Sequence, residues 1–194
     1  MTRSVQSGMS RAALLLVAAV GVVVSPQVGA GEITSLYTPL GLGACAVPPA
    51  EIARSYEGRD LAVEECPAPA PYRLFVVSSD ARSWVDLRRN DLDWSSEQRV
   101  VYGRDVLALG HFPNVSTSGV AEWRLDEKGI PLALIVRLRL VDPGGDATQG
   151  ATISRLLVVG LSADSFCDLG LAKSNEEARQ LADMAAPCTA AVAR

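Results

Sequence analysis

One long hairpin pattern stands out in the sequence: VAEWRLDEKGIPLALIVRLRLV, residues 120–141. Its first arm leads into Asp126–Gly129, a short connection that ends in glycine, as many hairpin connections do. In the return arm Arg137 and Arg139 share one face, because successive side chains of a strand point to opposite sides. The other face is apolar and carries Leu134, Val136, Leu138 and Leu140. The pattern therefore predicts an antiparallel sheet with one face in a core.

Further strands are predicted on both sides of this hairpin. They lie at residues 73–78, 84–88, 99–102, 106–109, 153–161 and 166–172. Residues 153–161 are apolar on both faces, which is typical of a central strand. The polar stretch Arg89–Gln98 is interpreted as a loop. The β pattern as a whole covers residues 72–172.

One helix is predicted near the C-terminus, over residues 174–186. Ser174 and Glu177 have the spacing of a capping box. An alanine-rich apolar stripe follows at helical spacing, and Pro187 ends the pattern. Together the elements predict an α+β fold: an antiparallel, curved sheet of about six to eight strands with one C-terminal helix.

Residues 1–30 have the features of a signal peptide. Arg3 and Arg11 precede or border an apolar run at 12–24, and Val28–Ala30 places small residues at a cleavage site. The apolar run is shorter than the stretch of about 20 residues that spans a bilayer; an uncleaved N-terminal anchor is the alternative. We therefore expect an exported protein, periplasmic or secreted, with no membrane span after cleavage.

After cleavage, residues 31–194 are expected to form a single α+β domain. Residues 31–71 are interpreted as an irregular N-terminal segment that precedes the sheet, with a short helical turn at 49–55. The formal net charge of the whole chain is −4, and the leader contains arginines but no acidic residue. The mature region is therefore acidic, and its bulk electrostatics do not favour binding to nucleic acid.

Four cysteines lie in the mature region: Cys45, Cys66, Cys167 and Cys188. An even number in an exported chain predicts two disulfides. We expect Cys45–Cys66 and Cys167–Cys188, because both pairs are neighbours in sequence and the second would fix the alanine-rich helix against the sheet. Each such loop contributes about 3 kcal/mol in the chain-entropy model. A zinc site is the alternative, but the sequence lacks the closely spaced cysteine pairs typical of zinc.

Several segments resemble a family of small exported alphaproteobacterial proteins. They are Asp80-Ala81-Arg82-Ser83, Val120–Arg124, Ile130–Arg137, Leu156–Val159 and Asn175–Asp183, with Cys167 between the last two. The similarity covers residues 72–190. It implies an exported, single-domain protein. Because the family has no assigned activity, the resemblance implies no catalytic residue and no cofactor.

The sequence itself predicts no catalytic, metal or cofactor site. The single histidine, His111, is interpreted as a structural loop residue, and no G-x-S-x-G nucleophile motif occurs. Two carboxylate pairs, Asp91 with Asp93 and Glu64 with Glu65, are not assigned to catalysis. Neighbours in sequence do not fix the separation of two carboxylates that glycoside hydrolysis needs.

The candidate binding residues are Trp94, Glu122, Arg124, Arg137 and Arg139. Glu122 and Arg124 share a face of the first hairpin strand, as Arg137 and Arg139 do in the second. If the register aligns these faces, they form a charged patch that can hold an anionic ligand or a partner's carboxylate. A salt-bridged solvent face is the alternative. Trp94 is expected to be an exposed anchor in a polar loop, whereas Trp123 is expected in the core.

Two functions follow as hypotheses. The first is a non-enzymatic exported binding or interaction module, whose partner is an envelope protein or a small anionic ligand. The second is an envelope-acting hydrolase that uses dispersed carboxylates. The hydrolase hypothesis requires a cleft with two carboxylates, one of which has a raised pKa. The oligomeric state is not predicted.

Overall fold

The computed structural model describes residues 32–41, 43–103, 110–115, 119–144, 151–184 and 188. These residues belong to one compact unit that extends from Gly31 to Arg194. The strands are β1 (Thr34–Pro39), β2 (Ala62–Cys66), β3 (Arg73–Ser79), β4 (Arg82–Arg89), β5 (Leu92–Ser95), β6 (His111–Val115), β7 (Val120–Leu125), β8 (Pro131–Val141), β9 (Thr152–Leu161) and β10 (Phe166–Ala172). The helices are α1 (Ala50–Glu57), α2 (Glu97–Val100) and α4 (Asn175–Asp183).

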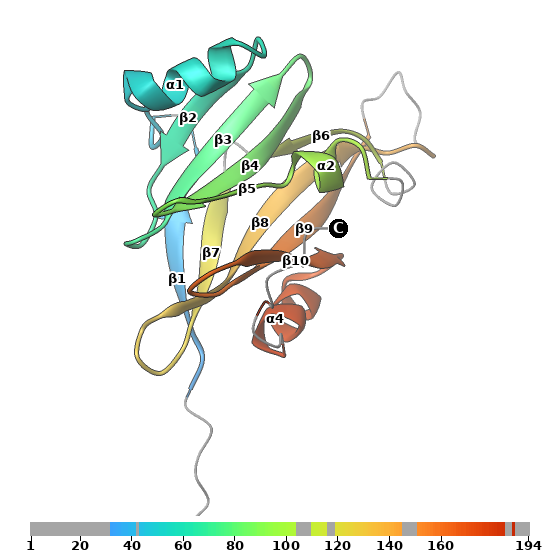
Figure 1. The fold of residues 1–194 in the computed structure, drawn as a ribbon. Coiled ribbons are helices and arrows are strands. Elements are labelled where there is room, and N and C mark those ends of the chain that lie inside the picture. The colour runs from blue at the N-terminus through green and yellow to red at the C-terminus, as the bar shows by residue number, and fades with distance from the viewer. Residues whose placement is uncertain are drawn as a thin grey trace, which may run out of the picture. The chain divides into compact units, whose positions relative to one another are not determined.

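The strands form two antiparallel sheets (Figure 1). Sheet A has the order β1-β7-β8-β9-β10, with β6 also paired to β8, and sheet B has the order β2-β3-β4-β5. β6 and β7 share one edge of β8, because β7 pairs with its first half and β6 with its second half. The predicted α+β class, with antiparallel strands, a C-terminal helix and disulfides, is confirmed. The described strands outnumber the predicted ones, and they divide between two sheets rather than one.

The prediction of an irregular segment at 31–71 is wrong, because this segment contains the strands β1 and β2. The helical turn expected at 49–55 is part of α1. β1 pairs with β7 along its whole length, and β2 pairs with β3. Leu36 and Tyr37 are adjacent in β1 and both exposed, so the strand lacks the alternation of a half-buried strand. Such an edge strand is determined by its backbone pairing with β7 and not by an alternation of apolar and polar residues in its own sequence.

The polar stretch Arg89–Gln98 is not a loop either. Asn90 has a φ angle of 53°, which asparagine tolerates, and it turns β4 into β5. The predicted strand at 99–102 is also wrong, because α2 ends only at Val100. The predicted strand at 106–109 lies outside the described residues. The sequence analysis assigned no strand to β6, which pairs with β8 across a register shift.

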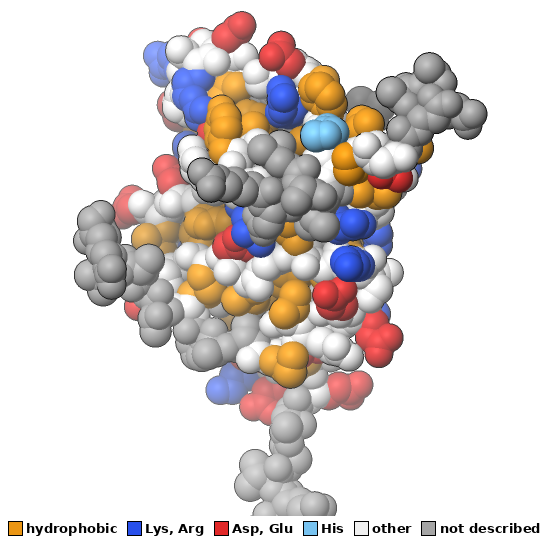
Figure 2. Space-filling view, turned by 90° about the vertical axis from the view of Figure 1, so that its right-hand side faces the viewer, with side chains coloured by type: hydrophobic (Ala, Val, Ile, Leu, Met, Phe, Trp, Pro, Cys, Tyr) orange, Lys and Arg blue, Asp and Glu red, His pale blue; other side chains and the backbone are white. Residues whose placement is uncertain are grey.

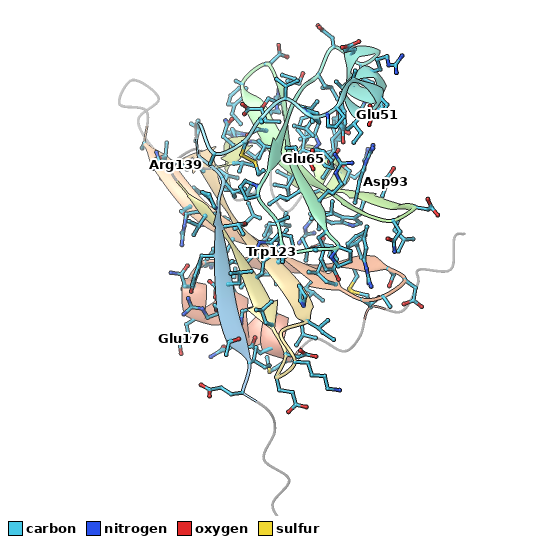
Figure 3. The ribbon with its side chains drawn as sticks, turned by 90° about the vertical axis from the view of Figure 1, so that its left-hand side faces the viewer. Glu51, Glu65, Asp93, Trp123, Arg139 and Glu176 are labelled. Atoms are coloured by element: carbon cyan, nitrogen blue, oxygen red, sulfur yellow. A yellow bond between two sulfur atoms is a disulfide. The ribbon has the colours of Figure 1, made fainter. Side chains whose placement is uncertain are left out.

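One hydrophobic core joins the two sheets. Sheet A contributes the apolar face that the hairpin predicts: Leu134, Val136, Leu138 and Leu140. Sheet B contributes Leu74, Val77, Val85 and Leu87. Trp123 is fully buried in this core, as expected (Figure 3). Its ring centroid lies 5.8 Å from that of Tyr72.

The opposite face of sheet A packs against α4. Ala178 and Ala182 of the helix form a second, smaller cluster with sheet residues that include Ile135 and Val158. Alanine side chains bury little apolar area, so this contact contributes less than the core between the sheets. The helix therefore depends on additional contacts for its position.

The start of α4 agrees with the predicted capping box. The backbone N–H of Glu177 donates to Ser174 Oγ at 3.1 Å, as a capping box requires. The Glu177 carboxylate accepts from the backbone N–H of Lys173 at 2.8 Å, one residue before the N-cap Ser174. The end of the helix differs from the prediction of residue 186. The last helical residue is Asp183, and residues 185–187 lie outside the described part of the chain.

Two disulfides join distant parts of this unit. Cys45–Cys66 links the loop before α1 to the end of β2, and Cys167–Cys188 links β10 to the segment after α4. This is the pairing that the sequence separations favour. Among the described residues, no helix has the length and apolar character needed to cross a membrane.

Candidate functional site

The hairpin register places the predicted charged residues on one face of sheet A. Glu122 is paired with Ile135 and Arg124 with Ala133, so both share a face with Arg137, two residues further along β8. Arg139 follows on the same face. The charged patch is therefore assembled as hypothesised. It lies on the face of sheet A that also packs against α4.

Glu122 and Arg124 are not part of an exposed surface. Their residues are only 7% and 8% exposed. The expectation of an open charged patch that contains both side chains is therefore corrected. The sequence could not show this, because the helix that lies over them comes from a distant part of the chain.

Glu122 is held by hydrogen bonds from two sides. Its carboxylate accepts from Arg179 Nε at 2.7 Å and Nη2 at 3.2 Å, and from Ser35 Oγ at 2.7 Å. Burial alone would raise the pKa of Glu122, but the hydrogen bonds from Arg179 and Ser35 outweigh it and lower the pKa. Glu122 is therefore a structural anion at neutral pH.

Arg124 is occupied by a neighbouring acid. It donates from Nε to Asp183 Oδ1 at 2.8 Å and from Nη2 to Asp183 Oδ2 at 2.6 Å. This bidentate hydrogen bonding raises the pKa of Arg124. The pair connects β7 to the last residue of α4, so Arg124 fixes the helix rather than facing a ligand.

Arg137 and Arg139 differ from these paired groups. Arg137 donates from Nη1 to Ser154 Oγ and from Nη2 to Asn175 Oδ1, both at 2.6 Å, and neither partner is charged. Arg139 is exposed (Figure 3). Its side chain makes no hydrogen bond or ion pair with any residue that the structure describes. Within that part of the chain, neither guanidinium has a carboxylate partner.

These two arginines line a cavity of about 460 Å³, here called the arginine groove. Its polar lining residues are Tyr37, Glu122, Arg137, Arg139, Asn175 and Arg179. Three arginines thus face one glutamate, which already binds Arg179. The Tyr37 hydroxyl accepts from Arg179 Nη2 at 2.9 Å, so its own proton can be donated to a ligand. The groove carries an excess of positive charge in a chain of net charge −4.

Trp94 does not have the predicted role of an exposed anchor. It lies in β5, opposite Leu87 of β4, and is partly buried against the core. It belongs to sheet B, whereas the arginine groove is formed on sheet A. The prediction rested on the interpretation of its surroundings as a loop, and the structure overturns that interpretation.

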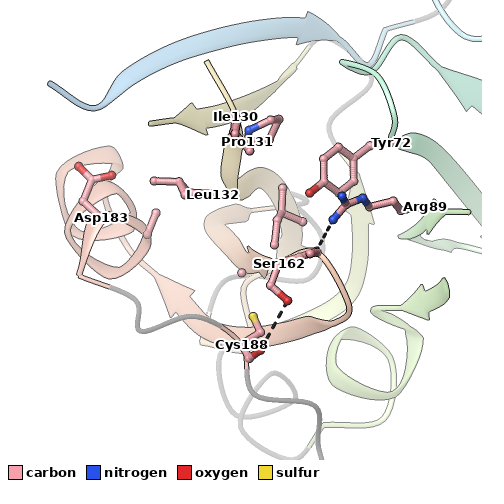
Figure 4. Close-up of a pocket in the computed structure, with 12 residues that line it drawn as sticks. Tyr72, Arg89, Ile130, Pro131, Leu132, Ser162, Asp183 and Cys188 are labelled. Atoms are coloured by element: carbon pink, nitrogen blue, oxygen red, sulfur yellow. Dashed lines mark hydrogen bonds between the residues drawn. The ribbon is translucent and has the colours of Figure 1, made fainter. Parts of the chain in front are cut away.

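A second cavity, here called the apolar pocket, has a volume of about 400 Å³ (Figure 4). Its lining includes Tyr72, Arg89, Leu132, Ser162 and Asp183. The sequence analysis named none of these as binding residues. They come from separate elements and carry no common motif, so no local signal could have grouped them.

Among the carboxylates that the structure describes, one has the raised pKa that the hydrolase hypothesis requires. Burial raises the pKa of Asp86, which accepts hydrogen bonds from Tyr56 at 2.9 Å and Ser95 at 2.5 Å. Asp86 lines neither the arginine groove nor the apolar pocket. A third cavity is lined by two carboxylates, Asp80 and Glu97, of which Glu97 is paired with Arg59 at 2.6 Å.

The carboxylate pairs singled out in the sequence lie on sheet B, in β2 and at the turn from β4 to β5. Glu64 and Glu65 are successive residues of a strand, so their side chains point to opposite faces. Asp93 pairs with Arg88 at 3.0 Å. His111 is exposed at the start of β6, where Figure 2 shows a histidine on the surface. Within the described ranges, no group of three or more His, Cys, Asp or Glu residues is placed to hold a metal ion.

The comparisons with known proteins add no relative. No family model, curated protein or solved structure matches this chain. The resemblance to exported alphaproteobacterial proteins therefore stays a prediction.

Proposed function

We propose that this protein is a non-enzymatic, exported binding module that holds an oxyanion, a carboxylate or phosphate group, in the arginine groove. The observation that carries the proposal is the pair Arg137 and Arg139. They stand two residues apart on one face of β8, and neither has a carboxylate partner among the described residues. An unneutralised pair of guanidinium groups in an acidic protein attracts anions.

The groove has the donors that oxyanion binding needs. Guanidinium groups present paired N–H donors whose spacing matches the two oxygens of a carboxylate or phosphate. Ser154 and Asn175 already hold Arg137, so little conformational entropy is lost when it binds a ligand. The volume of about 460 Å³ lies in the range of small-molecule sites.

The exported location rests on two supports. Residues 1–30 have the pattern of a signal peptide. The two disulfides are compatible with an oxidising compartment, such as the periplasm or the extracellular space. Membership in the exported alphaproteobacterial family that the sequence resembles is part of the same proposal.

Calorimetric titration of the oxidised protein at low salt tests this function. Citrate and pyrophosphate serve as small anions, and a glutamate-rich peptide represents the acidic segment of a partner protein. We expect saturable binding of at least one probe, weakened by added salt. The Arg137→Gln/Arg139→Gln variant should bind the probe with an affinity at least about tenfold lower, because hydrogen bonds to charged groups are lost.

Arg54→Gln is the matched control, because Arg54 is exposed on α1 and does not line the groove. It removes a positive charge while leaving the groove intact. Tighter binding of the peptide than of the small anions would identify a protein partner as the source of the oxyanion. The absence of binding by all probes at millimolar concentration would refute the proposal, as would an equal loss in the control.

A further inference from the structure

The apolar pocket is built from the ends of several elements (Figure 4). Ile130, Pro131 and Leu132 form one wall at the start of β8. Leu161 and Ala163 contribute from the end of β9 and the turn after it. Most of the remaining lining is also apolar, which favours the hydrocarbon part of a ligand.

Arg89 is the cationic group of this pocket. It donates from Nη1 to the Ser162 carbonyl at 2.7 Å, and its guanidinium carbon lies 5.4 Å from the centre of the Tyr72 ring. Figure 4 shows the guanidinium between these two residues. The Arg89 Nε–H is buried and has no hydrogen-bond partner among the residues that the structure describes. No carboxylate of the described chain forms an ion pair with Arg89.

The pocket also contains a carboxylate, Asp183, but that group is already neutralised. Its two oxygens accept from Arg124 at 2.8 and 2.6 Å. The pocket therefore combines apolar walls with one cation whose charge is not balanced. A dianion would lose too much hydration against such walls, whereas a single carboxylate on a hydrocarbon chain matches both features.

We propose that the apolar pocket binds a small amphiphilic carboxylate, with its hydrocarbon chain against Leu132 and Leu161 and its carboxylate on the Arg89 guanidinium. This site is separate from the arginine groove, whose lining includes neither Arg89 nor these leucines. The inference does not depend on the function proposed for the groove.

Calorimetric titration of the full oxidised protein with octanoate tests the proposal, with octanol and octylamine as neutral and cationic probes of the same chain length. We expect one octanoate per chain. Octanol and octylamine should bind with affinities at least about tenfold lower than that of octanoate. Octanol lacks the charge-assisted hydrogen bond to Arg89, and the positive charge of octylamine is repelled by Arg89. The Arg89→Met variant should bind octanoate more weakly by about the same factor, while its affinity for octanol should change little.

A second variant covers the case in which Arg89→Met does not fold. Ala163 is exposed and lines the pocket, so Ala163→Phe should fold and obstruct the space that the hydrocarbon chain needs. This variant should bind both octanoate and octanol more weakly than the wild-type protein does. Arg139→Gln is the control for binding in the arginine groove and should leave octanoate binding unchanged.

Three results would overturn the proposal. The first is no octanoate binding at millimolar concentration. The second is equal affinity for octanoate and octanol, which would remove the role of Arg89. The third is a loss of octanoate binding in Arg139→Gln with no change in Ala163→Phe, which would place the ligand in the groove. None of these results would contradict the binding of citrate, pyrophosphate or the acidic peptide in the arginine groove.

Discussion

Glu122→Gln removes one buried negative charge and preserves the shape of the side chain. In the structure the Glu122 carboxylate accepts three hydrogen bonds, from Arg179 and Ser35, and lies 3.6 Å from Arg124. Breaking a fully buried ion pair costs about 3–5 kcal/mol. The Arg179 side chain is 40% exposed, so solvent screens part of this interaction. We expect the free energy of unfolding to fall by about 2 kcal/mol at pH 7.

The loss should depend on pH with a defined sign. The folded protein lowers the pKa of Glu122, so the carboxylate contributes stability above the pKa of the unfolded chain, about 4.3. This contribution disappears as the pH falls through the lower folded-state pKa. The stabilities of the wild-type protein and Glu122→Gln should therefore converge as the pH falls below the pKa of the unfolded chain and through the lower folded-state pKa. Groups that titrate equally in both proteins cancel in the difference.

Urea unfolding at pH 7 and at pH 3, followed by tryptophan fluorescence, measures this difference. Glu64→Gln is the matched control, because Glu64 is exposed on β2. It should change the free energy of unfolding by less than about 0.5 kcal/mol. The reasoning fails if Glu122→Gln also costs less than this at pH 7, or if its cost is the same at both pH values.

The same variant separates stability from ligand binding. Loss of Glu122 leaves Arg179 without its carboxylate partner and raises the positive charge of the arginine groove. Citrate or pyrophosphate should therefore bind Glu122→Gln more tightly than the wild-type protein, although the variant is less stable. Weaker binding by a folded Glu122→Gln protein would contradict the proposed role of the groove.

Two further predictions concern the fold. Gly160→Ala places a methyl group 2.6 Å from Cys188 Sγ and 2.8 Å from Cys167 Sγ, so it should cost about 2 kcal/mol in urea unfolding. The cost should shrink in a Cys167→Ala/Cys188→Ala background; an equal cost in both would contradict the steric explanation. Burial raises the pKa of Asp86, so ionisation above its usual pKa of about 3.9 should reduce the stability of the wild-type protein relative to Asp86→Asn. Melting temperatures at pH 4 and pH 7 test this, and a relative gain by the wild-type protein at pH 7 would show the sign to be wrong.

The sequence predicted elements whose signal is local. The β7–β8 hairpin has a clear alternation and a turn, and the start of α4 has a cap in adjacent residues. β1 and β5 were missed because each is short, partly exposed and defined by pairing with another strand. The charged face was predicted correctly in its register, but the burial of Glu122 and Arg124 depends on a distant helix. The sequence did not indicate that Arg179 pairs with Glu122, because arginines commonly flank the apolar stripe of a surface helix.

The pairing of β1 with β7 has a consequence for the order in which the chain can fold. Ser35 and Glu122, which meet across this pairing, are separated by 87 residues in sequence. Sheet B, in contrast, is a meander of consecutive strands over residues 62–95. When the chain is synthesised from its N-terminus, sheet B can form before β7, the partner strand of β1, is available. During that interval the backbone N–H and C=O groups of β1 are unpaired, because its non-local contact with β7 forms late. We therefore expect β1 to be the segment that most readily pairs with a strand of another chain.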